Sequence, residues 1–292
     1  MMNIIELYQA YPGFLLFTLI LVGLIFGSFL NVVIYRLPIM LKHEWTSQCK
    51  QYLEIDDSAA KVSPYNLLTP RSQCPHCHHL IPAWQNIPVI SYLLLGGKCR
   101  QCQQRIGFRY PLIEILTAGL TVVLYFQFGA GWQMFSAIIF IYFLIILTAI
   151  DIDTQLLPDQ LTLLLLWIGL LVNTQMLFVP LQEAVLGAIL GYLSLWSIYH
   201  LYRLATKKEG FGYGDFKLLA ALGAWVGWTM LPVIILLSSI TGVIAGILMI
   251  LSRRHSYTNP LPFGPYLAIA GGITILWGND ILDFYWQLVS LA

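Results

Sequence analysis

Long apolar runs separated by short polar stretches dominate the pattern of hydrophobic and polar positions along the chain. Most of these runs are near the roughly 20 residues that an α-helix needs to cross a hydrocarbon core of about 30 Å. The pattern predicts an all-α polytopic integral membrane protein with about eight transmembrane helices and both termini on the outer side. We expect these helices at roughly 13–35, 110–128, 133–150, 160–178, 183–203, 217–229, 231–252 and 264–284.

The positively charged side chains indicate how these helices are oriented. All 15 Lys and Arg fall into three segments: nine from Arg36 to Arg109, four from Arg203 to Lys217, and the pair Arg253 and Arg254. Lys and Arg are enriched in the cytoplasmic loops of membrane proteins. We therefore expect all three segments on the cytoplasmic side of the membrane.

Composition supports the same class of protein. The chain has 292 residues, of which 58% are hydrophobic and only 10% charged, and its mean hydropathy is +0.75. Soluble domains carry about 25% charged residues, so these values exclude a soluble or disordered protein. The formal net charge of +1 gives no reason to expect nucleic-acid binding, and the lipid bilayer is the expected partner.

One polar region is long enough to fold by itself between the first two helices. We divide the chain into a first transmembrane helix (1–35), a cytoplasmic zinc-binding domain (36–109) and a transmembrane bundle (110–292). Six of the 14 prolines lie in the middle part, which predicts turns and irregular structure there and not long helices. They are Pro38, Pro64, Pro70, Pro75, Pro82 and Pro88.

Four of the five cysteines form two C-x-x-C pairs. Cys74 and Cys77 are followed, 21 residues later, by Cys99 and Cys102. Two such pairs can close a tetrahedral Zn²⁺ site, and four thiolates leave no open position, so the ion would be structural. The alternative is a redox-active dithiol. Cys49 is expected to be a free thiol. Because the pattern is that of a metal site and not of a disulfide framework, we expect this segment to lie in a reducing compartment.

Acidic residues beside apolar helices are the second chemical signal, because an ionised carboxylate in the membrane is costly and is retained for function. Asp151 ends one apolar run, and Asp215 lies in a glycine-rich loop before another. Our topology puts both at cytoplasmic helix ends and at similar depth. Two such acids can share one proton, activate water and protonate a leaving amine, which is aspartic peptide hydrolysis.

Other roles for the acidic residues stay open at this point. Asp153 is a second-rank candidate, Asp159 has the position of a helix N-cap, Asp215 could pair with Lys217, and Glu114 with Arg109. A membrane transporter that uses Asp151 and Asp215 as an ion or proton relay is the alternative function. A non-catalytic membrane assembly subunit, with the cysteine-containing domain as its docking module, is a third.

Several motifs in the chain resemble those of type IV prepilin peptidases. The segment from Gly212 through Gly214 to Asp215 resembles the GxGD signature of intramembrane aspartyl proteases. The segment from Asp151 to Asp159 is similar to the first-aspartate motif of the prepilin peptidases. The likeness continues through the segments 27–38, 86–92, 96–100, 109–114 and 262–265 and through the four paired cysteines, so it covers nearly the whole chain.

The resemblance implies two activities on one polypeptide of the bacterial inner membrane. The first cleaves the basic leader of type IV prepilins and type II secretion pseudopilins after a glycine, with Asp151 and Asp215 as catalytic aspartates. The second methylates the new N-terminal amine with S-adenosylmethionine as donor. The four cysteines match the family's zinc ligands. The methyl donor is expected near residues 36–109, with Arg36, Asn86, Gly97 and Lys98 as candidate contacts.

Overall fold

The computed structural model describes residues 12–55, 65–207, 212–251 and 262–290. In these residues the chain is helical, and the extended pairing is limited to two isolated bridges. The expected all-α class is confirmed. Two predicted features, Pro64 and the basic pair Arg253 and Arg254, lie outside the described residues. The chain forms two compact units, Met1–Phe126 and Gln127–Ala292, which are considered separately below.

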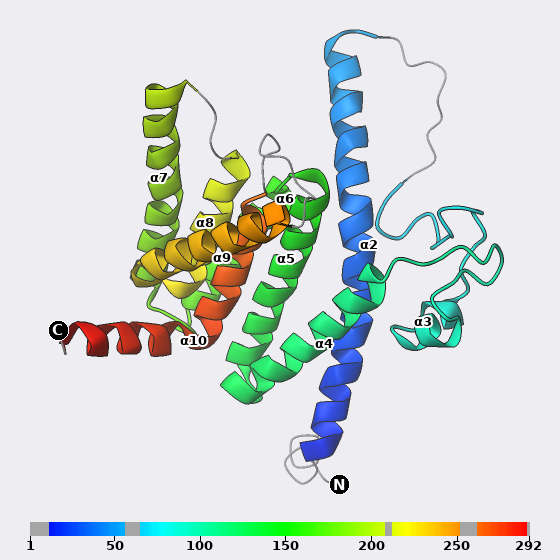
Figure 1. Cartoon of the computed structure of the whole chain (residues 1–292), viewed down its shortest axis with the longest axis horizontal. Helices are drawn as coiled ribbons and strands as arrows, with labels where there is room; N and C mark the ends of the chain where they lie inside the picture. The colour runs from blue at the N-terminus through cyan, green and yellow to red at the C-terminus, as the bar shows by residue number, and fades with distance from the viewer. Residues whose placement is uncertain (1–11, 56–64, 208–211, 252–261, 291–292) are drawn as a thin grey trace. The chain divides into compact units, whose positions relative to one another are not determined.

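The first unit contains two long helices with an irregular region between them (Figure 1). Helix α2 runs from Pro12 to Tyr52 and α4 from Arg109 to Phe128. The region between them holds the 3₁₀ helix η1 (Ala83–Asn86) and the five-residue helix α3 (Ile90–Leu94). The predicted domain boundaries, between residues 35 and 36 and between residues 109 and 110, stay predictions.

Helices α2 and α4 pack closely through small residues. A Cβ atom built on Gly23 would lie 2.6 Å from the Cα of Ala118, and one built on Gly27 would lie 2.7 Å from the Cα of Glu114. Small residues of this kind let helix backbones approach in membranes. The Asn31 side-chain amide donates a 3.1 Å hydrogen bond to the Tyr110 carbonyl at the start of α4. These contacts set the register of the two antiparallel helices.

The first helix is much longer than predicted. Helix α2 has 41 residues, or about 60 Å at 1.5 Å per residue, and it contains Pro38. The prediction that Pro38 belongs to a region without long helices was therefore wrong. Proline removes one backbone donor, but Leu37 and Leu41 are buried on either side of it and Arg36 is anchored to the loop at 66–70. This packing keeps the helix continuous.

The second unit is a bundle of helices, all at positions that the hydropathy pattern predicts (Figure 1). Short 155–158 and 174–180 connections separate its first three helices. The bounds are α5 (Trp132–Thr154), α6 (Asp159–Asn173), α7 (Leu181–Thr206), α8 (Tyr213–Val226), η2 (Trp228–Met230), α9 (Leu231–Leu251) and α10 (Gly264–Ser290).

Helix α8 is the centre of this bundle. From Phe216 to Val226 it is buried on nearly every side, as expected for a helix that is apolar all round. Gly223 of α8 packs backbone to backbone against Gly187 of α7. On the other side, the Trp225 indole N–H donates to the Leu165 carbonyl of α6 at 2.8 Å. The C-terminal half of α8 is therefore held between α6 and α7.

Six helices in the described residues are long and apolar enough to cross a membrane, namely α2, α4, α5, α7, α9 and α10, with α9 counted together with η2. Helix α6 is a shorter apolar helix of 15 residues, and α8 has 14. Helix α10 has one residue with non-helical dihedral angles, Trp277. The expected polytopic membrane protein is confirmed, while the number of crossings stays a prediction.

Candidate functional site

The two cysteine pairs form two loops with the same backbone geometry. In the first, the Cys74 N–H donates to the His79 carbonyl and the His78 N–H donates to the Cys74 carbonyl. In the second, the Cys99 N–H donates to the Gln104 carbonyl and the Gln103 N–H to that of Cys99. The residue after each pair has a positive φ, 54° in the first loop and 58° in the second. Each loop thereby turns its two sulfurs toward the same side.

The four cysteine sulfurs gather into one cluster that could hold a metal ion. All lie within 4.8 Å of one another, with Cys74 Sγ 3.8 Å from Cys102 Sγ and Cys77 Sγ 4.0 Å from Cys99 Sγ. Thiolates are the form that binds metal. The backbone N–H of Cys77 lowers the pKa of Cys74 to about 6, and that of His76 adds to the effect. The predicted grouping of these cysteines is confirmed, and Cys49 is exposed and apart from them.

The buried Arg36 side chain joins α2 to the loop that precedes the cysteine cluster. Its guanidinium donates to the carbonyls of Asn66 at 2.9 Å, Leu67 at 3.3 Å and Pro70 at 2.6 Å. It also lies over the Tyr65 ring, 5.8 Å from the centroid. Arg36 therefore holds this loop through backbone carbonyls.

The other three candidate methyl-donor residues flank α3. Asn86 ends η1, and Lys98 pairs with Arg105 in an isolated bridge beside the second cysteine loop. Gly97 has a φ of +67°, and a Cβ atom there would lie 2.9 Å from the Tyr92 ring. A side chain at Gly97 would therefore displace α3 or strain the backbone.

A buried carboxylate on α4 fixes the start of α3. Glu114 Oε2 accepts a 2.8 Å hydrogen bond from the Val89 N–H. Val89 has φ 58° and ψ −48°, and the Ile90 N–H donates to the Pro88 carbonyl two residues back, so residues 88–90 form a γ-turn. Positive φ is strained for a β-branched residue. Sequence reasoning offered Arg109 as the partner of Glu114 and gave no signal for Val89.

In the second unit, Asp151 and Asp215 are the buried carboxylates of the described part, with 4% and 7% of their surface exposed. Asp151 lies in the last turn of α5 and Asp215 in the first turn of α8. Both predicted aspartates are thus at helix ends, and Asp215 is within electrostatic range of Asp151. The N-terminus of α8 favours a negative charge at Asp215.

Glycines and one leucine fill the space around these two carboxylates. A Cβ atom on Gly264, at the start of α10, would lie 2.5 Å from Asp151 Oδ2 and 3.1 Å from Leu157 Cδ1. A Cβ atom on Gly214 would lie 2.7 Å from Leu157 Cβ. Leu157 thus packs between the glycine before Asp215 and the glycine that faces Asp151. Three helix ends, of α5, α8 and α10, meet at this point.

The two carboxylates differ in their hydrogen bonding. Asp215 Oδ2 accepts a 3.2 Å hydrogen bond from the Gly212 N–H, which orients the side chain back along its own turn. Asp151 Oδ2 is buried and accepts no hydrogen bond among the described residues. A buried acceptor of this kind is costly and marks a site for a polar ligand. A backbone N–H faces each carboxylate, that of Gly212 at Asp215 and that of Gly264 at Asp151, and Asp151 Oδ2 is the oxygen left without a hydrogen bond among the described residues.

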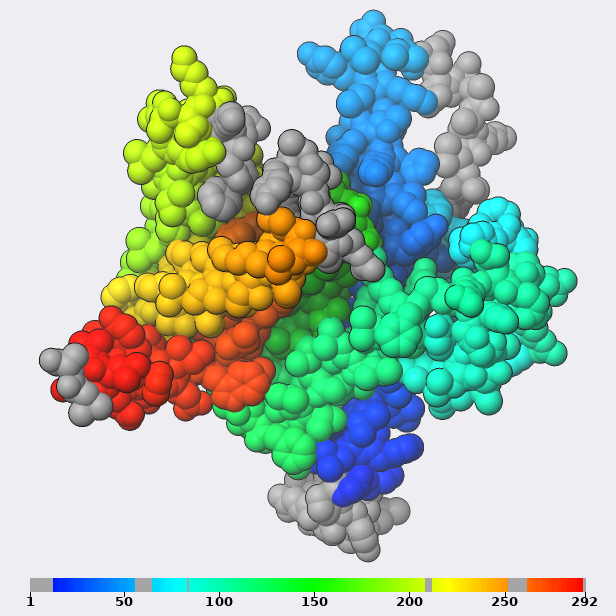
Figure 2. All heavy atoms as spheres, viewed as in Figure 1, coloured from blue at the N-terminus to red at the C-terminus, as the bar shows by residue number. Residues whose placement is uncertain are grey.

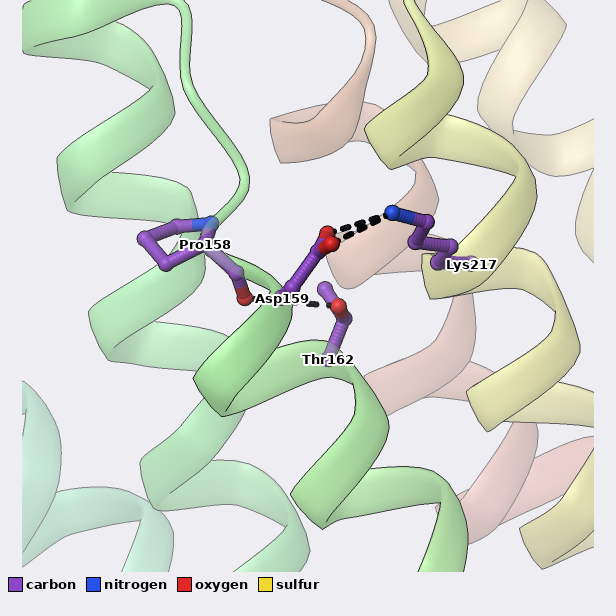
Figure 3. A network of polar contacts seen from close by, with 4 residues as sticks. All are labelled: Pro158, Asp159, Thr162 and Lys217. Atoms are coloured by element: carbon purple, nitrogen blue, oxygen red, sulfur yellow. Dashed lines mark hydrogen bonds and ion pairs between the residues drawn. The ribbon is translucent and has the colours of Figure 1, made fainter. Parts of the chain in front are cut away.

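The neighbouring acidic residues Asp153 and Asp159 are exposed, unlike Asp151 and Asp215. Asp153 lies two residues after Asp151. Asp159 is the first residue of α6 and makes no capping hydrogen bond; both its oxygens lie 2.6 Å from Lys217 Nζ (Figure 3). The interpretation of Asp159 as an N-cap was therefore wrong, and Lys217 pairs with Asp159 and not with Asp215. Lys217 lies on α8, 58 positions away in sequence, which is why the sequence did not indicate the pair.

Comparison with known families matches both halves of the chain. Residues 21–128 match the bacterial peptidase A24 N-terminal domain, and residues 138–247 match the type IV leader peptidase family. The first match contains the four cysteines, and the second contains Asp151 and Asp215. No solved structure matches the chain significantly.

Curated relatives are similar over nearly the whole length. A prepilin leader peptidase/N-methyltransferase of Aeromonas hydrophila is 53% identical over 282 residues, covering 97% of each chain. Proteins of the same name from Pseudomonas aeruginosa and Neisseria gonorrhoeae are each 48% identical. The former match covers 99% of each chain, and the latter covers 92% of this chain and 91% of the relative. With both domain models matched in order and such relatives at full length, the chain belongs to the type IV leader peptidase family.

Proposed function

We propose that this protein is an enzyme of the bacterial inner membrane that cleaves the leader of type IV prepilins and pseudopilins and N-methylates the new N-terminus. The observation that carries the proposal is that two buried carboxylates, Asp151 and Asp215, lie within electrostatic range of each other where three helix ends meet. Relatives named prepilin leader peptidase/N-methyltransferase at 48–53% identity support the same assignment.

In the proposed cleavage step, Asp151 and Asp215 share one proton. The ionised carboxylate takes a proton from water as the water oxygen attacks the scissile carbonyl carbon. The protonated carboxylate gives its proton to the carbonyl oxygen, which produces a neutral tetrahedral diol. Proton transfer to the amide nitrogen then breaks the C–N bond, leaving the leader with a carboxyl group and the pilin with a free amine. The unused Asp151 oxygen supports a role in holding the water.

The topology of the substrate fits the proposed placement of the dyad. A basic leader stays in the cytoplasm, and the pilin helix that follows it lies in the bilayer. The scissile bond then lies near the inner membrane surface. Asp151 and Asp215 stand at helix ends flanked by the basic segment from Arg203 to Lys217. We therefore propose that both aspartates and residues 36–109 are on the cytoplasmic side.

For the cysteine cluster we propose a structural Zn²⁺ ion. Four sulfurs placed about 2.3 Å from zinc in a tetrahedron lie about 3.8 Å apart. The cysteine cluster agrees with this geometry, since two of its sulfur pairs are separated by 3.8 and 4.0 Å. Bound metal would hold the two cysteine loops together in a region with few buried apolar side chains. The ion would take no part in either reaction.

Methyl transfer needs a second substrate, and we propose S-adenosylmethionine as the donor. Gly97, Lys98 and Asn86 are proposed to line the donor site, because they flank α3 beside the second cysteine loop. Arg36 is proposed as a positioning residue, since its guanidinium donors are used by the carbonyls of the loop at 66–70. The amine released by cleavage would attack the donor methyl carbon, which breaks the carbon–sulfur bond and releases S-adenosylhomocysteine, and the methylated amine would lose a proton.

The proposal is tested with purified enzyme in lipid nanodiscs, a prepilin and labelled S-adenosylmethionine. Mass spectrometry of the pilin should show loss of the leader and gain of one labelled methyl group. Asp151→Asn should give neither product from prepilin but should still methylate pilin that was cleaved beforehand, which shows that the variant is folded. Asp153→Asn is the matched control, because its exposed carboxylate lies on the same helix.

Two results would overturn the assignment. Cleavage by Asp151→Asn at the wild-type rate would show that Asp151 is not a catalytic residue and that the proposed dyad is wrong. Ion transport into liposomes by a protein that leaves prepilin intact would favour the transporter alternative.

A further inference from the structure

The register of α2 and α4 indicates how deep the residues of the first unit lie in the membrane. Asn31 lies level with Tyr110, Gly27 with Glu114 and Gly23 with Ala118. Helix α4 is one of the apolar helices long enough to span the bilayer, and it begins at Arg109. Glu114 is five residues further on, or about 7 Å deeper at 1.5 Å per residue. Glu114 therefore lies inside the outermost turns of a membrane span.

Helix α3 is attached at that depth. The Val89 N–H, immediately before α3, donates to Glu114 Oε2, and the Tyr92 ring contacts the Phe108 ring with centroids 6.4 Å apart. Phe108 directly precedes α4. Residues 65–108 form a lobe on one flank of α2, and α3 lies in that lobe (Figures 1 and 2). The two contacts hold α3 beside the first turns of α4 and not above them.

The side chains that α3 presents at this level are apolar and exposed. Leu93 is 70% exposed, Leu94 is 78% exposed, and no residue of the helix is buried. Phe108 is also exposed, and it connects this surface to the exposed residues Tyr110 and Leu112 at the start of α4. The apolar surface of α3 is therefore continuous with the lipid-facing surface of a membrane span.

The charges around α3 are basic except for Glu114, whose carboxylate accepts from the Val89 N–H. Residues 65–113 contain five Lys and Arg and no Asp or Glu. A divalent ion on four thiolates carries a net charge of −2, so the segment keeps about +3 even with metal bound. Arg100 lies over the Trp84 ring, 5.2 Å from its centroid, and Trp84 is half exposed. Trp and basic side chains are typical of membrane surfaces.

We propose that α3 is an interfacial membrane helix: it inserts Ile90, Leu93 and Leu94 into the leaflet surface beside α4, and the surrounding basic residues bind anionic phospholipid headgroups. The partner is an anionic lipid bilayer. This attachment holds the metal-binding lobe against the membrane at the level where α4 enters it. The proposal does not depend on the proposed catalytic function, and its test uses no activity as the deciding measurement.

The test uses full-length protein in nanodiscs of phosphatidylglycerol and phosphatidylethanolamine, with p-benzoylphenylalanine in place of Leu94. After irradiation, mass spectrometry measures the yield of lipid adduct. Phe17, in the apolar half of α2, is the positive control site, and Tyr52, the exposed last residue of α2, is the negative one. We expect a yield at Leu94 similar to that at Phe17 and at least about fivefold above that at Tyr52.

A second arm tests the charge preference by replacing phosphatidylglycerol with phosphatidylcholine. The yield at Leu94 should fall at least about twofold while that at Phe17 stays the same. Cross-links from Leu94 to residues 127–292 in place of lipid would overturn the proposal, as would a yield at the level of Tyr52. An unchanged yield at Leu94 in phosphatidylcholine would overturn the preference for anionic lipid.

Discussion

We predict that losing the hydrogen bond between Glu114 and Val89 slows methyl transfer. Glu114→Ala removes the acceptor of the Val89 N–H, which is 2.8 Å from Oε2. Helix α3 then loses the contact that fixes its first turn. Because Asn86, Gly97 and Lys98 flank α3, we expect the proposed donor site to lose its arrangement while the dyad in the second unit keeps its own.

The size of the effect follows from the contact. A hydrogen bond to a charged group contributes about 1.5–3 kcal/mol. The backbone at Val89, with φ 58° and ψ −48°, is strained by about 1–3 kcal/mol. The hydrogen bond to Glu114 compensates for this strain in the wild type. Since 1.4 kcal/mol is tenfold, loss of the hydrogen bond alone should lower the ratio of placed to displaced α3 about 10- to 100-fold. Glu114→Gln keeps an acceptor and should lose less than about tenfold.

The assay separates the two activities. Methyl transfer is measured on pilin that was cleaved beforehand, and leader cleavage is measured on prepilin, with the same enzyme in the same nanodiscs. Glu114→Ala should slow methyl transfer about 10- to 100-fold and change the cleavage rate less than about twofold. Metal content, measured in parallel, should stay the same because the cysteine loops keep their own hydrogen bonds.

The reasoning is refuted if Glu114→Ala methylates at the wild-type rate, because α3 would then need no anchor. It is equally refuted if Glu114→Gln is as defective as Glu114→Ala, since hydrogen-bond acceptance would not be the property that matters.

Three further predictions concern other parts of the molecule. Gly97→Ala should impair methyl transfer more than Gly96→Ala: both positions have positive φ, but only Gly97 has the Tyr92 ring in the way, so equal losses would show that φ alone matters. Cys74→Ser should remove the metal ion measured by elemental analysis, and acid should release it from the wild type because protons compete for the thiolates; a metal content unaffected by either change would contradict the four-sulfur site. Gly223→Leu should lower the thermal unfolding temperature, because the backbone of α7 occupies the position of the new side chain, whereas a variant of unchanged stability would contradict the packing.

The sequence predicted the features that depend on local pattern. Apolar runs gave the positions of the helices, because length and hydropathy are properties of each segment alone. Cysteine spacing gave the cluster, because two short chelates are complete within a few residues each. Asp151 and Asp215, selected because acids beside apolar runs are costly, are buried in the structure, and their catalytic role stays a prediction.

Features that depend on distant contacts were missed. Pro38 lies inside α2 because side chains packed around it outweigh the lost donor. Lys217 reaches Asp159 only because α6 and α8 pack together, so neither residue signals the other in sequence (Figure 3). Val89 gives no local sign of a positive φ, since glycine and asparagine are the usual residues there. Each of these errors came from reading an element without its partner.

A cycle of single and double substitutions tests most directly whether Asp151 and Asp215 work as one unit. The catalytic efficiency of leader cleavage is measured for Asp151→Asn, Asp215→Asn and the double variant in the same lipid. Residues that act together lose nearly everything when either is removed, so all three variants should fall to the same residual rate. Losses that multiply in the double variant, or substantial cleavage by either single variant, would contradict a shared dyad.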